Sequence, residues 1–193
     1  MNRIESLKEK INNLYLAKNP KRADWSDWLH TNHIFVVAEY AEKLAERYGA
    51  NKELAVAAAM LHDVADSVMS RFFDNHEEKS SKIARELLTE SGFTNQEIQI
   101  IVEDEIKLHS CHSGKFPQTL EGKVMATADA LAHLKTDFYE HATQAMKANK
   151  TPTEISQWAL PKIERDFNNK IFFKEVRDEV RPYYEKLKSK FSV

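Results

Sequence analysis

The chain has 193 residues, of which 42% are hydrophobic and 30% charged, and its formal net charge is -2. This composition suits one domain with a sizeable core, and the near-neutral charge gives no indication of binding to nucleic acid or an anionic membrane. The one cysteine, Cys111, excludes an intrachain disulfide and favours a reducing, cytoplasmic location. No apolar run approaches the roughly 20 residues that span a bilayer, and the charged N-terminus lacks the apolar core of a signal peptide.

Apolar residues recur at three- and four-residue spacing along nearly the whole chain, and no segment keeps the two-residue alternation of a strand. This pattern predicts about eight helices with short connections, and therefore an all-α fold. We expect residues 1–193 to form one domain in which 1–20 and 150–193 pack on a central helical core. The predicted helical segments cover residues 4–17, 28–49, 51–68, 75–88, 94–109, 124–134, 151–163 and 172–191.

Local signals mark several ends of these segments. Asn51 is a predicted N-cap, and Thr94 and Glu97 have the spacing of a capping box. Gly49 follows a helical pattern, where a left-handed residue is expected. Pro182 predicts a kink or a break in the last helix, because proline lacks the N–H that a helix interior needs.

A histidine and an aspartate, His62 and Asp63, end the most apolar of these segments, in the sequence AAAMLHDVAD. An ionised carboxylate at such a place is costly unless it is paired or bound to a metal. No Lys or Arg lies within four residues of Asp63, which excludes a local ion pair. The simpler interpretation is a helix end whose two side chains reach solvent.

Two other segments carry side chains of the same kind. Asp129 lies in the nearly apolar segment 124–134, without a Lys or Arg at helical neighbour spacing, and His33 lies on the apolar face of segment 28–49. A divalent cation at the place where the three helices meet would satisfy all of these groups at once. The sequence therefore indicates a metal site.

The order of a histidine, a histidine–aspartate pair and a distant aspartate resembles the HD superfamily of metal-dependent phosphohydrolases. The sequences HIFVVAEYA, AAMLHDVAD and LEGKVMATADAL also resemble the motifs of that family, and the resemblance covers residues 28–135. It implies an HD-domain-like helical bundle. It also implies a divalent metal held by His33, His62, Asp63 and Asp129.

Two further histidines resemble the additional ligands of HD enzymes that bind two metals. His76 begins a predicted helix and His109 ends another. The resemblance implies a second metal held by Asp63, His76 and His109, with Asp63 shared between the two ions. The alternative is that His76 and His109 are surface histidines beside loops, which are common at helix ends.

Asp66 follows Asp63 by one helical turn, in the sequence HDVAD. In some HD nucleotidases an acidic residue at this place orients the attacking water, and a carboxylate beside a metal-activated water suits that catalytic role. An ordinary exposed aspartate at a helix end is the alternative.

Three basic residues near the additional histidines are candidates for binding the phosphate of a substrate. Arg71 and Lys79 flank His76, and Lys115 follows His109 in a loop. Cations at such places would neutralise the charge that develops on phosphoryl oxygens. Each of the three is also an ordinary surface residue when considered alone.

The chain departs from one branch of the family. The HD-GYP branch often carries the sequence HDIGK, whose lysine contacts phosphate, but here the corresponding sequence is HDVAD, and the GYP motif is absent. These departures argue against a cyclic-dinucleotide phosphodiesterase. The sequence also has no P-loop, no GxGxxG, no HExxH and no GxSxG.

The sequence therefore predicts a metal-dependent phosphohydrolase, a phosphomonoesterase or phosphodiesterase, acting on an ester or anhydride of a nucleotide or other small metabolite. One or two ions of Mn, Fe, Co, Ni or Zn suit its nitrogen and oxygen ligands. Two alternatives stay open, a non-catalytic HD protein that binds metal or nucleotide, and a di-iron HD oxygenase. Three aromatic side chains of the last helix form either a candidate homodimer surface or ordinary packing contacts: Tyr183, Tyr184 and Phe191.

Overall fold

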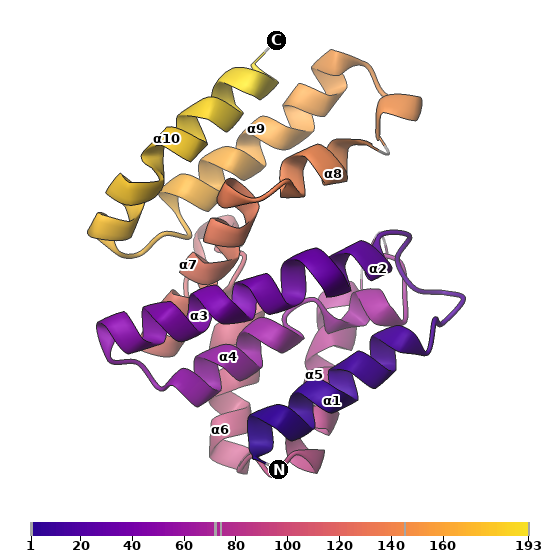
Figure 1. Ribbon diagram of the computed structural model, residues 1–193, viewed down its shortest axis with the longest axis vertical. Coiled ribbons are helices and arrows are strands. Elements are labelled where there is room, and N and C mark those ends of the chain that lie inside the picture. Colours follow the sequence, from indigo (N-terminus) through magenta and orange to yellow (C-terminus); the bar gives the residue numbers. More distant parts are fainter. Residues whose placement is uncertain (1, 72, 74, 145, 193) are drawn as a thin grey trace.

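The computed structural model describes residues 2–71, 73, 75–144 and 146–192 of the chain. The described residues form helices and connecting segments without a strand, which confirms the all-α prediction (Figure 1). The α-helices are α1 (Arg3–Leu16), α2 (Ser26–Leu29), α3 (Phe35–Tyr48), α4 (Lys52–Leu61), α5 (His76–Glu90), α6 (Asn95–Ile100), α7 (Leu120–Lys135), α8 (Phe138–Gln144), α9 (Pro152–Asn168) and α10 (Lys174–Phe191).

Side-chain caps begin most of the long helices. The Asn51 side chain accepts hydrogen bonds from the first turn of α4, and Thr94 and Glu97 form the predicted capping box at α6. Gly49 ends α3 in the left-handed conformation, with φ of 74°. Pro182 lies inside α10, which continues through it, so the break that the sequence allowed does not occur.

Three helices form the centre of the fold. Helices α3, α4 and α7 pack against one another, and most residues of α4 and α7 are buried. The alanines Ala57, Ala58 and Ala59 are fully buried in α4, where their small side chains let neighbouring helices approach closely. Helices α9 and α10 lie side by side beyond α7, at the opposite end of the molecule from α1 and α6 (Figure 1).

Two segments of π-helix interrupt the α-helical geometry. Segment η1 (His30–Ile34) leads into α3, and segment η3 (Ile101–Ile106) continues α6 toward His109. Turns of this wider kind are rare and often accompany functional sites. Shorter 3-10 turns are η2 (Val64–Ser67), η4 (His112–Gly114) and η5 (Met146–Ala148).

The sequence predicts no segment long and apolar enough to span a bilayer. Among the helices that the structure describes, none is both long enough and apolar enough to cross a membrane.

Candidate metal centre

Side chains from three separate elements meet in the interior. His33 comes from η1, His62 follows the last residue of α4, and Asp129 lies in the middle of α7. The exposed fractions of these residues are 1%, 3% and 1%. His33 Nε2 lies 3.3 Å from His62 Nε2 and 3.3 Å from Asp129 Oδ1, and His62 Nε2 lies 3.6 Å from the same oxygen.

This spacing suits a transition metal. Ligand atoms about 2.1 Å from one ion and at right or tetrahedral angles are about 3.0–3.4 Å from each other. Two imidazole nitrogens and a carboxylate oxygen are the donor set that Mn, Fe, Co, Ni and Zn accept. The residues at this place therefore fit such an ion.

A second group of ligand atoms shares His62 with the first. The side chains of His62, Asp63 and His109 each offer one atom, and the three atoms lie within 4.8 Å of one another. Asp63 Oδ2 is 3.5 Å from His62 Nε2. The two groups together bring five of the six predicted metal ligands to one place.

Backbone carbonyls orient two of the rings. His62 Nδ1 donates a hydrogen bond to the Ala59 carbonyl at 2.8 Å, and His109 Nδ1 donates to the Ile106 carbonyl at 2.6 Å. Because a carbonyl only accepts, the proton lies on Nδ1 and the lone pair of Nε2 faces the cluster. Burial lowers the pKa of His109 to about 4, so this imidazole is neutral, the form that binds metals.

The two oxygens of Asp129 have different surroundings. Oδ2 accepts a hydrogen bond from Lys170 Nζ, whereas Oδ1 is buried without a hydrogen bond and faces the imidazoles. Burial opposes ionisation of Asp129, but the neighbouring His133 imidazole and Lys170 ammonium outweigh it and hold its pKa well below the usual range. An ionised buried oxygen without a donor is an open ligand position for a cation.

A polar network behind Asp129 was not predicted. His133 Nε2 lies 3.3 Å from Asp129 Oδ1, and His133 Nδ1 is 2.9 Å from Asp166 Oδ2. The Tyr139 hydroxyl donates to that same Asp166 oxygen at 2.5 Å. Lys170 lies between the two carboxylates, because its Nζ is also 3.6 Å from Asp166 Oδ1. The network holds both oxygens of Asp129, because His133 lies beside Oδ1 and Lys170 donates to Oδ2.

Asp66 is not the exposed residue that the alternative interpretation expected. It is fully buried in η2, where Arg71 donates to its carboxylate and His76 Nε2 lies 3.0 Å from its Oδ1. Arg71 also forms an ion pair with Asp63. Thus His76, the sixth predicted ligand, contacts Asp66 here, and Arg71 joins the two aspartates of the HDVAD sequence.

Candidate ligands other than His33 open onto a pocket of about 360 Å³. Arg71 and His76 lie in its wall, as does the exposed Phe73. Its lining residues are His62, Asp63, Arg71, Phe73, His76, Glu77, Ser80, Ser81, Ile106, Lys107, His109, Ser110, Asp129, His133, Lys162, Arg165 and Lys170.

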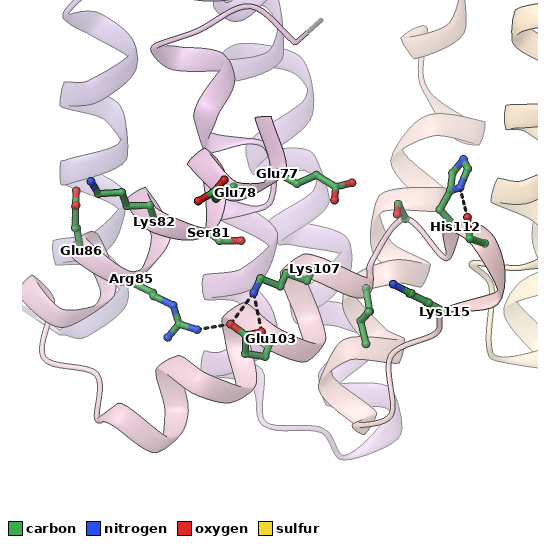
Figure 2. A pocket seen from close by; sticks show the side chains of 13 residues that line it. Glu77, Glu78, Ser81, Lys82, Arg85, Glu86, Glu103, Lys107, His112 and Lys115 are labelled. Carbon is green, nitrogen blue, oxygen red and sulfur yellow. Dashed lines mark hydrogen bonds and ion pairs between the residues drawn. The ribbon is translucent and has the colours of Figure 1, made fainter. Parts of the chain in front are cut away.

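A larger hollow of about 980 Å³ adjoins this pocket, since Glu77, Ser81, Lys107 and Ser110 line both. Figure 2 shows this hollow, with Lys115 at one side and the cations Arg85 and Lys107 both bonded to Glu103. Lys115 lines the hollow and not the pocket, and Lys79 lines neither. Of the three predicted phosphate-binding residues, the structure therefore places Arg71 alone beside the candidate ligands.

Comparison with known proteins identifies the family of the chain. Residues 31–134, more than half of the chain, match the family model described as HD domain. The chain belongs to the HD domain family. This confirms the resemblance drawn from His33, His62, Asp63 and Asp129, all of which lie inside the matched range. HD domains are generally metal-dependent hydrolases, and the donor set described above is consistent with a bound divalent metal.

One curated relative of this HD domain comes from Clostridium beijerinckii and is described as an uncharacterized protein. It is 31% identical over 124 residues, which cover 62% of this chain and 76% of the relative. No solved structure matches the chain.

Residues outside the matched HD domain complete the site. Lys162, Arg165, Asp166 and Lys170 all follow residue 134, and sequence reasoning missed them. One signal could have found part of the network, because His133 follows Asp129 at the i,i+4 spacing of a shared helix face. Lys170 follows Asp166 at the same spacing.

Proposed function

We propose that this HD protein hydrolyses a phosphate ester or anhydride of a nucleotide or another small metabolite, using one or two divalent metals. The observation that carries the proposal is Oδ1 of Asp129, buried and without a hydrogen bond, beside the Nε2 atoms of His33 and His62. A bound metal supplies Lewis acidity toward water and phosphoryl oxygens at this place.

The ligand roles follow from the two groups of donor atoms. His33, His62, Asp63 and Asp129 are the proposed ligands of the first metal. For a second metal, Asp63 and His109 are supported by their closeness to His62. His76 is the remaining proposed ligand, and it would have to exchange Asp66 for the metal, since its Nε2 now contacts that carboxylate.

The contacts of Asp66 suggest a positioning role for this carboxylate. Its carboxylate binds Arg71 and His76 and is fully buried, so we propose that it positions those two side chains at the pocket wall. Direct orientation of the attacking water by Asp66 stays a prediction. Arg71, at the pocket wall, would contact substrate only after release from one aspartate, because it now pairs with Asp63 and Asp66.

The test is metal content measured together with hydrolysis. Purified wild type and the variant Asp129→Asn would be compared by elemental analysis, and by activity on phosphomonoester and phosphodiester substrates with added Mn, Fe, Co, Ni or Mg. We expect one or two metals per chain in the wild type. We expect Asp129→Asn to lose most of the metal and the hydrolytic activity together, because it removes an anionic ligand. His112→Ala is a matched control, because His112 is exposed and lies outside both groups of ligand atoms.

Other outcomes separate the alternatives. A metal-loaded wild type without activity on a broad substrate panel would favour a binding protein. Two irons with a mixed-valence signal would favour oxidation. A wild type that binds no metal, with a variant of unchanged stability, would contradict the proposed site.

A further inference from the structure

The pocket that holds the candidate ligands is rich in cations from distant parts of the chain. The positively charged side chains that line it are Arg71, Lys107, Lys162, Arg165 and Lys170. A phosphorylated ligand needs such charges near its oxygens, because phosphoryl groups are anionic and accept several hydrogen bonds. A cation of the pocket is free to bind a phosphoryl group only if it does not already have an anionic partner in the protein.

Three of these five cations already have an anionic partner. Arg71 forms ion pairs with Asp63 and Asp66. Lys107 donates to both oxygens of Glu103, at 2.8 and 2.7 Å (Figure 2). Lys170, buried between Asp129 and Asp166, pairs with both of those carboxylates. Binding a phosphoryl group through any of them would compete with a contact that the protein already makes.

The other two cations, Lys162 and Arg165, have no such partner. Within the described residues, neither side chain has an ion pair or a hydrogen bond to another side chain, and Arg165 Nε is buried without a hydrogen bond. The ammonium of Lys162 lies 5.4 Å from the centre of the Phe138 ring. Lys162 is half-buried, and burial lowers the pKa of its ammonium group. An unpaired cation in such a place is costly in the absence of an anion.

The contacts of the acidic side chain Asp166 are made to other groups than these two cations. Asp166 attracts Lys162 electrostatically, but its Oδ2 accepts from both His133 and Tyr139. Its Oδ1 lies 3.6 Å from Lys170. Among the described residues, neither oxygen of Asp166 forms an ion pair with Lys162 or Arg165, so both cations lack a direct anionic partner.

Helix α9 brings the two cations to the metal ligands. Lys162 and Arg165 are three residues apart, which places them on one face of the helix. The following residues Asp166 and Lys170 anchor that part of the chain to His133 and Asp129. An anion held by Lys162 and Arg165 would therefore lie in the same pocket as Asp129.

We propose that Lys162 and Arg165 form a phosphate-binding subsite, supplied by α9 from outside the matched HD domain. The inference rests on the proposed hydrolase function and specifies its substrate class. Two unpaired cations match the two negative charges of a terminal phosphate, so the substrate is a phosphomonoester, or an anhydride attacked at its terminal phosphate. A phosphodiester, with one charge per phosphate, would leave one cation uncompensated.

The first test uses inorganic phosphate and does not depend on catalysis. Wild type, Lys162→Met and Arg165→Gln would be titrated calorimetrically, each with its metal present and after chelation. We expect each variant to weaken phosphate binding by about tenfold, the usual effect of removing one hydrogen bond to a charged group. Lys186→Gln, on the exposed surface of α10, is the matched control. Equal binding by wild type and both variants would overturn the subsite.

Stability gives an independent readout. Removing an unpaired cation should leave the melting temperature unchanged or raise it, and phosphate should stabilise the wild type more than either variant. A variant that melts lower than wild type in the absence of phosphate would show a structural role for that side chain, which contradicts the proposal.

The second test separates this proposal from the proposed function. With p-nitrophenyl phosphate and bis(p-nitrophenyl) phosphate as substrates, Arg165→Gln should raise KM for the monoester by about tenfold and affect the diester less. Its metal content should equal that of the wild type, and Arg165→Lys should restore part of the binding. Hydrolysis with an unchanged KM would overturn the subsite and leave the hydrolase intact. Phosphate binding lost in the variants, with no hydrolysis by wild type, would support the subsite and contradict the hydrolase.

Discussion

The Nζ atom of Lys170 donates a hydrogen bond to Oδ2 of Asp129, although 41 residues separate the two in the chain. Lys170 itself is 2% exposed, so a lysine charge is held in the interior beside the central carboxylate of the site. The contact occupies one oxygen of Asp129 and leaves the other to the imidazoles. It also joins the segment after α9 to α7.

Replacing Lys170 with methionine should destabilise the protein strongly. The variant Lys170→Met leaves Asp129 and Asp166 without their shared cation, and breaking a buried pair typically costs about 3–5 kcal/mol of unfolding free energy. Urea denaturation would measure the loss. Added Mn or Ni should restore part of it, because a metal neutralises Asp129. Lys174→Met, which breaks the exposed pair with Asp178, should change stability by less than about 0.5 kcal/mol. Equal losses in the two variants would contradict this account.

The buried carboxylate of Asp66 should be needed for stability as well as activity. Asp66→Asn removes the buried carboxylate that pairs with Arg71 and leaves Arg71 with Asp63 alone, so we expect a loss of about 3 kcal/mol by chemical denaturation. Activity should fall in the same variant, because Arg71 and His76 lose the group that positions them. A variant with wild-type stability and no activity would instead favour the direct role in orienting water.

Glu105 should make the protein less stable as pH rises, and the substitution Glu105→Gln should remove this effect. This residue of η3 is fully buried with no hydrogen bond to either oxygen, and burial raises its pKa well above the usual value. In the folded protein it is therefore protonated at pH values where the unfolded chain is ionised. The stability that protonated Glu105 contributes is fully present below 4.5, its pKa in the unfolded chain. It is lost as pH rises to the higher pKa that Glu105 has in the folded protein.

The variant Glu105→Gln cannot ionise, so it should gain stability over wild type as pH rises. The difference should grow by up to about 1.4 kcal/mol per pH unit between pH 5 and 7. Urea unfolding of both proteins at pH 5, 6 and 7 would measure it. Glu103→Gln is the control, because Glu103 also lies in η3 but its side chain is partly exposed and pairs with Arg85. Parallel stability curves for wild type and Glu105→Gln would contradict the buried protonated state.

Gly122 should not tolerate a side chain. A Cβ at this position of α7 would lie 2.5 Å from Asp104 Oδ2 and 2.6 Å from Pro117 Cβ. Asp104 accepts hydrogen bonds from the backbone of Gln118 and Thr119, so it fixes the start of α7. We expect Gly122→Ala to lose about 1–3 kcal/mol of unfolding free energy, as overpacking does. Thermal denaturation would show it, and a variant as stable as wild type would refute the tight contact.

Parts of the fold were predictable because they depend on local pattern. Three- and four-residue spacing predicted the helices, and the capping residues Asn51 and Thr94 predicted where two of them begin. Ligand-type side chains on apolar faces, at His33 and Asp129, predicted that their helices meet around a polar site. Both the helices and the polar site were predictable because buried helix faces show in the sequence as apolar residues at helical spacing.

The parts that could not be predicted depend on how distant segments meet. Whether Arg71 is free or paired depends on the path of the loop that returns it to Asp63 and Asp66. No periodicity indicates that the segment after α9 reaches Asp129, since nothing in the sequence around Lys170 distinguishes this lysine from one that faces solvent. Long-range contacts of this kind are set by tertiary packing, which local pattern does not encode.

The two π-helical turns let the site tolerate a difference in chain length. Each turn holds about one residue more than an α-helical turn, and one precedes His109 while the other contains His33. Deleting a single residue from 101–106 would allow ordinary α-helical geometry with nearly the same total rotation, so His109 would keep its direction toward the other ligands. A deletion inside an α-helix that stays α-helical would instead turn the residues after it by about 100°. Homologues that lack one residue in 101–106 can therefore share the centre, whereas a one-residue deletion within α4 or α7 would turn a ligand away from it.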